Sequence, residues 1–280
     1  MSIHDDRTTL LGEGPLWHPE RHELWWCDIL GRRVHGPGRS HATTDMPSAM
    51  GWIDRGTVLL AQRGALLTLD LDSGATDHVA PLDADRPDLR SNDGRADPWG
   101  GFWVGTMGIE AEPRAGNYWR YYRGETRRLW GGVGIPNATC FHPSGFAVWC
   151  DTQMGIAWRQ DLDDAHGWPK GDPTPFVDLS GQGRNIDGAV FDAEGTLWAA
   201  MWGEGAVVGF REGGREVGRF EFPARQTSCP ALGGEGLSTL FCTSASIGLA
   251  QPLAAREPDQ GRTFALPTGL KGLPEHRVIL

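Results

Sequence analysis

The sequence lacks the features of several common protein classes. It has no apolar run near the roughly 18 residues that a membrane-spanning helix requires. Its first residues are polar and acidic, whereas a secretory signal is basic and then apolar. Positive charge is in deficit, because 26 Lys and Arg stand against 36 Asp and Glu, for a formal net charge of −10. Binding to nucleic acid or to an anionic membrane needs a basic surface. We therefore expect neither partner, and we expect a cytoplasmic protein.

Cysteine and the common hydrolase motifs are also scarce. The chain has five Cys, an odd number, and no CxxC pair, which is not the pattern of a disulfide framework or a thiolate zinc site. There is no HExxH motif and no GxSxG elbow, which argues against a zinc protease and a serine hydrolase. We expect reduced, buried thiols and a different chemistry.

Turn-forming residues and tryptophan are abundant instead. The 280 residues include 40 Gly, 19 Pro and 13 Trp, and long runs of helix-forming residues are missing. Frequent Gly and Pro indicate frequent turns, and Trp packs well on pleated surfaces. This composition predicts an all-β protein with many short strands.

One pattern recurs along the chain. An apolar pair and a Pro, Asp or Gly turn lead into a short apolar strand, as in 16–19 followed by 24–28 and in 140–145 followed by 148–151. Such copies, some degenerate, start near residues 17, 52, 97, 141, 191 and 232. A repeat of about 40–50 residues with several short strands is typical of a propeller blade. We predict a six-bladed β-propeller with four-stranded antiparallel blades, a single domain over 1–280, in preference to a β-sandwich or two small β domains.

The repeat also predicts details of the blades. Residues 66–70 and 206–210 are expected to form third strands of their blades. A propeller must close its ring to remove open sheet edges. We expect 7–11 to pair with the last blade, beside a strand at 276–280.

Polar residues occupy one address in these repeats. Counting six residues back from the turn position gives Glu13, Asn92, Asn137, Asp187 and Ser228. Equivalent positions of successive blades are related by rotation about the central axis, so these side chains should converge near one mouth of the channel. Carboxylate and carboxamide oxygens bind calcium, magnesium or manganese, and zinc accepts carboxylates. Alternatively, each side chain caps its own loop. Recurrence at one address favours a metal or ligand site.

At these residues the sequence resembles the regucalcin/gluconolactonase/luciferin-regenerating enzyme family, and its sugar-lactonase branch most. The resemblance extends along nearly the whole chain. It rests on the order and spacing of the motifs at 11–17, 90–94, 102–107, 141–145, 151–152, 187–188, 192–198, 227–229 and 243–245.

The resemblance implies a site and an activity. It implies one divalent cation, with calcium or zinc first and manganese, magnesium or iron as the others, held by Glu13, Asn137 and Asp187. It places Arg90 and Asn92 in the substrate pocket. Glu110 is a further substrate-binding candidate. Family members that are enzymes mostly hydrolyse sugar lactones, so a lactonase of carbohydrate metabolism is expected.

A lactone is a cyclic ester, so its hydrolysis needs a polarised carbonyl and an activated water. Asp187 is the candidate general base, and Arg90 and Asn92 are candidates to bind sugar hydroxyls, Arg90 also to stabilise the developing oxyanion. Two alternatives stay open: a non-enzymatic calcium-binding or ligand-binding propeller, and a metal-dependent esterase or organophosphate hydrolase. A small-molecule sugar lactone is the expected partner, and a monomer is the default.

The chain departs from the family pattern at three places. Ala138 stands where Gly is usual after Asn137, and Ile186 stands where Pro is usual before the Asp. Residues 117–120 replace a usual Leu-Tyr pair. Trp119 and Trp202 are candidates for the pocket lining, and their positions bear on substrate choice.

Overall fold

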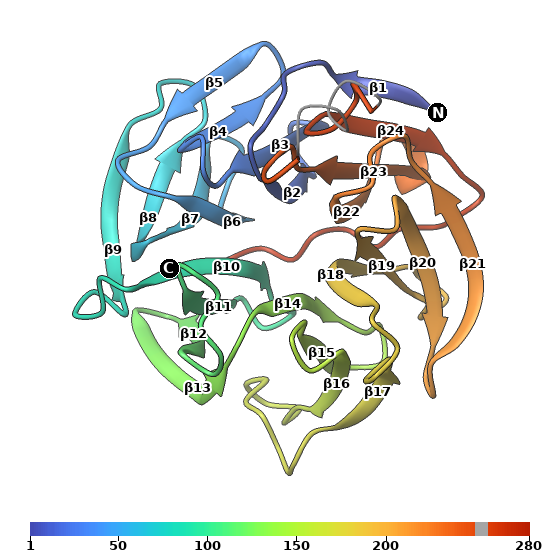
Figure 1. The fold of residues 1–280 in the computed structure, drawn as a ribbon. Helices are drawn as coiled ribbons and strands as arrows, with labels where there is room; N and C mark the ends of the chain where they lie inside the picture. The colour runs from blue at the N-terminus through green and yellow to red at the C-terminus, as the bar shows by residue number, and fades with distance from the viewer. Residues whose placement is uncertain (250–256) are drawn as a thin grey trace.

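Six four-stranded antiparallel sheets lie in a ring around a common centre in the computed structural model, which describes residues 1–249 and 257–280 (Figure 1). The predicted six-bladed β-propeller is confirmed. Residues 66–70 and 206–210 lie in the third strands of their blades, as expected. In the described part of the chain, no helix is long and apolar enough to cross a bilayer.

The strands follow one another in chain order within the first five blades. Blade 1 is β2 (Gly12–His18), β3 (Glu23–Asp28), β4 (Arg33–Gly36) and β5 (Arg39–Ala42). Blade 2 is β6 (Pro47–Trp52), β7 (Thr57–Gln62), β8 (Gly64–Asp70) and β9 (Thr76–Leu82). Blade 3 is β10 (Leu89–Ala96), β11 (Phe102–Gly108), β12 (Gly116–Tyr122) and β13 (Glu125–Val133).

The second half repeats this arrangement. Blade 4 is β14 (Pro136–Phe141), β15 (Phe146–Asp151), β16 (Ile156–Asp161) and β17 (Thr174–Asp178). Blade 5 is β18 (Asn185–Phe191), β19 (Leu197–Trp202), β20 (Ala206–Arg211) and β21 (Arg215–Glu221). Blade 6 is β22 (Thr227–Gly233), β23 (Thr239–Ser244), β24 (Thr263–Pro267) and the N-terminal β1 (Ser2–Asp5), and a 3-10 helix η1 (Glu235–Leu237) links two of them.

Apolar clusters fill every junction between neighbouring blades. Phe146 and Phe176 of blade 4 meet Phe191 and Phe210 of blade 5, for example, and comparable clusters join the other blade pairs. Both faces of each blade are thus buried, which explains the many apolar and Trp-rich strands. All five cysteines are free and buried, as expected.

The innermost strand of each blade carries a bulge. The register between this strand and its neighbour shifts once in all six blades. In blade 1 the shift follows Glu13, and in blade 4 it follows Asn137. A bulge re-aims a side chain and ends regular pairing. The bulges therefore turn the side chains of one repeat position out of the regular strand pattern.

The ring closes differently from the prediction. Blade 6 takes its outer strand from Ser2–Asp5, which pairs with β24. Residues 7–11 form no strand, although Leu11 makes an isolated bridge to Ala245 and the Thr9 N–H donates to the carbonyl of Gly261. Residues 276–280 form no strand in the described chain. The last residues instead run across the ring from β24 toward β10 (Figure 1). The N–H groups of Val278 and Ile279 donate to the carbonyls of Trp52 and Gly100.

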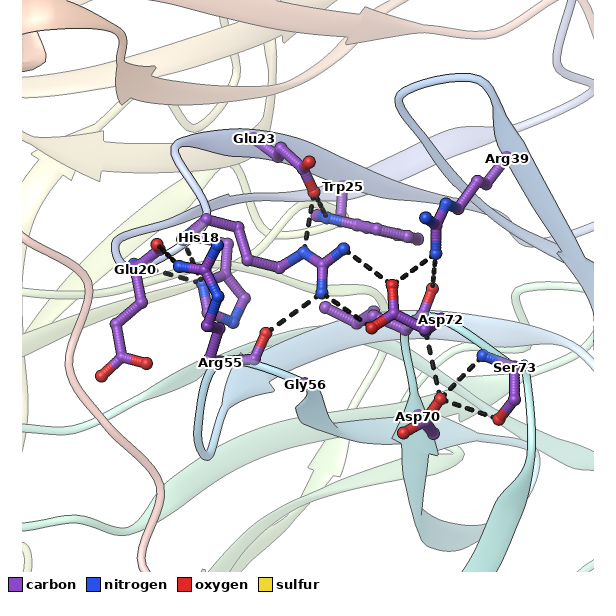
Figure 2. Close-up of polar contacts among 12 residues, drawn as sticks. His18, Glu20, Glu23, Trp25, Arg39, Arg55, Gly56, Asp70, Asp72 and Ser73 are labelled. Atoms are coloured by element: carbon purple, nitrogen blue, oxygen red, sulfur yellow. Dashed lines mark hydrogen bonds and ion pairs between the residues drawn. The ribbon is translucent and has the colours of Figure 1, made fainter.

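Polar turns fasten the outer parts of the blades. His18 accepts hydrogen bonds at Nδ1 from the backbone amides of Glu20 and Arg21 in the turn that follows β2 (Figure 2). Arg21 donates to Asp72 of the β8–β9 turn over 2.9 Å, and Arg39 also contacts this carboxylate. Exposed ion pairs of this kind add little stability each. Their effect here is to join blade 1 to blade 2.

Candidate active site

Four bulged inner strands deliver polar side chains to one cavity of about 410 Å³. Five side chains form its buried end, here called the floor. All five are buried, with exposed fractions from 3% for Asn137 to 8% for Arg90. They are Glu13 of β2, Arg90 and Asn92 of β10, Asn137 of β14 and Asp187 of β18. The structure thus brings together four of the five residues that the repeat singled out, with Arg90 beside them.

A chain of hydrogen bonds orders the floor. Arg90 Nη1 donates to Asn92 Oδ1 over 2.7 Å, and Asn92 Nδ2 donates to Asn137 Oδ1 over 2.9 Å. Asn137 Nδ2 donates in turn to the hydroxyl of Thr152 over 2.8 Å. That hydroxyl donates to the carbonyl of Ile186 over 2.6 Å, next to Asp187. The chain links three blades and fixes which end of each carboxamide faces which neighbour.

The two floor carboxylates are in an unfavourable setting for their charges. Burial, with the nearby charge of Asp93, raises the pKa of Glu13 to about 8, although the Gly14 amide and Arg90 oppose the shift. Burial, followed by the charge of Glu13, holds the pKa of Asp187 well above its ordinary value. Burial also lowers the pKa of Arg90 to about 10. The protein itself supplies too little positive charge here for two ionised carboxylates.

This deficit fits a bound cation. Glu13 Oε2 accepts only the amide of its neighbour Gly14, at 3.1 Å, among its hydrogen bonds to described residues. Within the described residues, no group of three or more His, Cys, Asp and Glu is placed to hold a metal. The set here has two carboxylates and the carboxamide oxygen of Asn137, all oxygen donors, which suits a hard cation. The residues present therefore fit a divalent ion.

Other expected site residues lie elsewhere. Ser228 is fully buried, and its hydroxyl donates to the carbonyl of Gly12, so it is not part of the cavity lining. Trp119 is also outside the lining, because its Nε1 donates to Asp83 over 2.9 Å. Glu110 is exposed and does not line the cavity, although residues on either side of it do. Its role toward a substrate stays a prediction.

Sequence reasoning missed several residues of the region. Ser48 holds the blade 2 address and donates to the Ser91 hydroxyl over 2.7 Å. The same offset of six, counted back from Asp54, would have found it. Thr152 belongs to the motif at 151–152, but the sequence indicates no role for it. Trp202 does line the cavity, as expected.

The chain is similar to several known proteins. The family described as SMP-30/Gluconolactonase/LRE-like region matches residues 11–246. A Rhizobium meliloti protein provisionally named as a sugar lactone lactonase is 38% identical over 94% of this chain and 91% of its own. The L-arabinolactonase of Azospirillum brasilense is 32% identical over 98% of this chain and 94% of its own. The crystal structure of a calcium-binding protein, regucalcin, from Agrobacterium tumefaciens aligns with a TM-score of 0.96 and 38% identity, covering 99% of this chain and 97% of that one.

Proposed function

The chain belongs to the SMP-30/gluconolactonase/LRE-like family, and on this premise we propose that it hydrolyses a sugar lactone to the sugar acid with the help of one divalent cation. Glu13, Asn137 and Asp187 would hold the cation. The observation that carries the proposal is the pair of buried carboxylates, with their unmet need for positive charge, at the closed end of a 410 Å³ cavity. Cavities of this size typically bind small molecules.

The bound cation would polarise the lactone carbonyl and lower the pKa of a water, which are the two things that opening a cyclic ester needs. Asp187 would accept the proton of the attacking water. A new bond forms between that water oxygen and the carbonyl carbon, and the bond from this carbon to the ring oxygen breaks. The ring oxygen takes up a proton, from Asp187 or from water, and becomes the hydroxyl of the sugar acid.

Arg90 would orient the substrate in this scheme, and Asn92 would position Arg90. Arg90 uses Nη1 for its side-chain hydrogen bonds to described residues. Its other N–H groups are free to donate to a substrate oxygen, including one that gains negative charge during attack. Asn92 donates from Nδ2 to the carbonyl of Pro136 and to Oδ1 of Asn137. Its main effect is therefore to hold Arg90 and Asn137 in place.

A second function is favoured by one comparison, because the Agrobacterium protein is described by its binding of calcium. A propeller that binds calcium without turnover would use the same three ligands. Hydrolysis of a lactone separates the two functions, because only the enzyme turns it over.

The test is lactone hydrolysis by the purified protein, followed with a pH indicator on a panel of aldonolactones. The protein is assayed as isolated, after chelation, and after return of calcium, zinc, manganese, magnesium or ferrous iron. We expect activity that chelation abolishes and one ion restores, and a loss of about 100-fold or more in Asp187→Asn. An intact, cation-binding protein with no activity on any lactone would overturn the proposal in favour of calcium binding without turnover.

A further inference from the structure

The polar floor faces a hydrocarbon wall. Six aliphatic side chains from segments at or just beyond the strand ends line the rest of the cavity: Leu11, Met107, Ile109, Ala111, Ile135 and Ile247. Trp202 adds an aromatic face. Most of these side chains are more exposed than the floor, and Ile247 is 38% exposed. The cavity is therefore polar at its buried end and apolar toward its opening.

Outside the floor, the described lining has two polar side chains besides Trp202, and one of them is already hydrogen-bonded. The hydroxyl of Thr152 already accepts from Asn137 and donates to Ile186. Asn185, at the start of β18, is the other polar side chain outside the floor among the described lining residues. Arg90 is the one cationic side chain of that lining, and it lies in the floor. Among the described lining residues, the outer end of a ligand thus meets few groups that can bond to a hydroxyl, chiefly the Asn185 carboxamide, and none that carries positive charge.

A wall of this kind treats two sorts of sugar lactone differently. An aromatic ring stacks on the C–H face of a sugar and leaves the hydroxyls around the edge of the sugar in water. Branched aliphatic side chains surround the group that they contact, so a hydroxyl placed against them loses its hydrogen bonds to water without replacement. A methyl group in the same place gains from its burial.

We propose that the site prefers sugar lactones whose end remote from the carbonyl is deoxygenated, with a methyl where the common aldonolactone has a hydroxymethyl. This proposal rests on the lactonase function proposed above and specifies its substrate class. Ile109 and Ile247 are the specificity-determining residues of the wall. The carbonyl and the hydroxyls next to it meet the floor, and the terminal methyl meets the isoleucines.

The experiment compares matched lactones that differ only in this oxygen. L-Fucono-1,4-lactone is paired with L-galactono-1,4-lactone, and L-rhamnono-1,4-lactone with L-mannono-1,4-lactone, in the presence of the cation that supports activity. We expect kcat/KM to be about 10- to 100-fold higher for the deoxy member of at least one pair, the range over which an apolar pocket discriminates against an added hydroxyl. Hydrolysis of both members at equal rates, or faster hydrolysis of the hydroxylated ones, would overturn the preference and leave the lactonase function standing.

Variants locate the preference in the wall. Ile109→Thr and Ile247→Thr each introduce a hydroxyl and should reduce the deoxy preference by about 3- to 10-fold. Ile3→Thr is the matched control, because Ile3 is 41% exposed on β1 and does not line the cavity. An unchanged preference in both wall variants would contradict the assignment of these residues.

Binding distinguishes the two possible failures. If no lactone is hydrolysed, the proposed function fails, and thermal shift with L-fuconate and L-galactonate still tests the wall. Tighter binding of L-fuconate supports the apolar preference, and equal or weaker binding overturns it.

Discussion

The side-chain amide of Asn92 donates a hydrogen bond to Oδ1 of Asn137 over 2.9 Å, and so joins the inner strands of blades 3 and 4 inside the cavity. Asn137 in turn donates from Nδ2 to Thr152. These two contacts leave a single orientation for the Asn137 carboxamide, with its oxygen toward Asn92 and its nitrogen toward blade 4's Thr152. The proposed cation ligand is therefore set by residues that need not touch the cation themselves.

Thr152 gives the sharpest test of this relationship. Thr152→Val keeps the shape of the side chain but removes the hydroxyl that accepts from Asn137 and donates to the carbonyl of Ile186. Asn137 and Asp187, the proposed ligands on either side, would then be held less firmly. We expect cation affinity to fall by about 10- to 100-fold, as for other groups that orient metal ligands. Calorimetric titration of the chelator-treated protein measures this. Thr152→Ser keeps the hydroxyl and should bind like the parent, and a valine variant that did the same would remove Thr152 from the site.

Chelation should have a stability effect that depends on pH. The pKa of Glu13 in the folded chain is about 8 against an ordinary value of 4.5. A raised folded-state pKa means that the folded state binds more protons than the unfolded state between these values. In the absence of the cation, the contribution of Glu13 to the free energy of unfolding is therefore fully present below pH 4.5 and falls as pH rises toward 8. Cation binding needs ionised ligands, so the Tm gained on adding it should grow from pH 5 to pH 8.

Glu13→Gln is the control for this titration. The variant keeps the size of the side chain and has no charge to bury, so the thermal stability of the chelated protein should vary less with pH over the same window. Unfolding of parent and variant is followed at pH 5, 6, 7 and 8, with and without chelator. If both show the same slope after chelation, Glu13 is not the group responsible.

Gly14 is a position at which the bulge tolerates no side chain. It has a φ of +54°, and a Cβ there would lie 2.4 Å from the carbonyl oxygen of Ser48. Gly14→Ala therefore adds left-handed strain of about 1–2 kcal/mol and a clash of about 1–3 kcal/mol. Gly38→Ala isolates the strain, since Gly38 has a φ of +63° and nothing within 4 Å of its Cβ position. Urea unfolding should show a clearly larger loss for Gly14→Ala, and equal losses would refute the clash.

The repeat made the fold and the floor predictable, because rotation about the axis converts an equal offset in sequence into proximity in space. Glu13, Asn92, Asn137 and Asp187 were found in this way. Ala138 is the one notable departure in their backbone, since it adopts a φ of +54°, where Gly is usual. Such a strained residue persists only where its surroundings enforce it.

Features outside the repeat were not predictable in the same way. Ring closure was assigned to 7–11 and 276–280, because short alternating segments near the two ends carry no marker of their strand partner. The repeat also places no constraint on the path of the loops. The direction of the Glu110 side chain therefore could not be derived from its position in the sequence, and neither could the position of the wall isoleucines at the cavity. Local turns decide which loop residues lie close together. In one such turn the backbone amide of Glu110 donates to the Glu112 carboxylate over 3.1 Å.

The C-terminal segment offers a last prediction, about stability. Arg95 of β10 pairs with Glu275 over 2.7 Å, with side chains 13% and 8% exposed, and Trp52 Nε1 donates to the Glu275 carbonyl. Among the described residues, Glu275→Ala leaves the Arg95 side chain one hydrogen bond, to the carbonyl of Ala189 at 3.3 Å. Removing one partner of a buried pair typically costs about 3–5 kcal/mol, and the partial exposure here places the expected loss near about 3 kcal/mol.

A double variant separates the ion pair from simple loss of packing. Arg95→Met removes the buried charge and keeps much of the side-chain volume, so Glu275→Ala should cost clearly less in its presence than in the parent. Urea unfolding of the parent, the two single variants and the double variant gives the coupling. Additive losses would mean that the segment is held by the packing of Val278 and by the backbone hydrogen bonds that Val278 and Ile279 donate to Trp52 and Gly100, rather than by the ion pair. A coupling of at least about 1 kcal/mol would instead identify the Arg95–Glu275 pair as the contact that fastens the end of the chain across the ring.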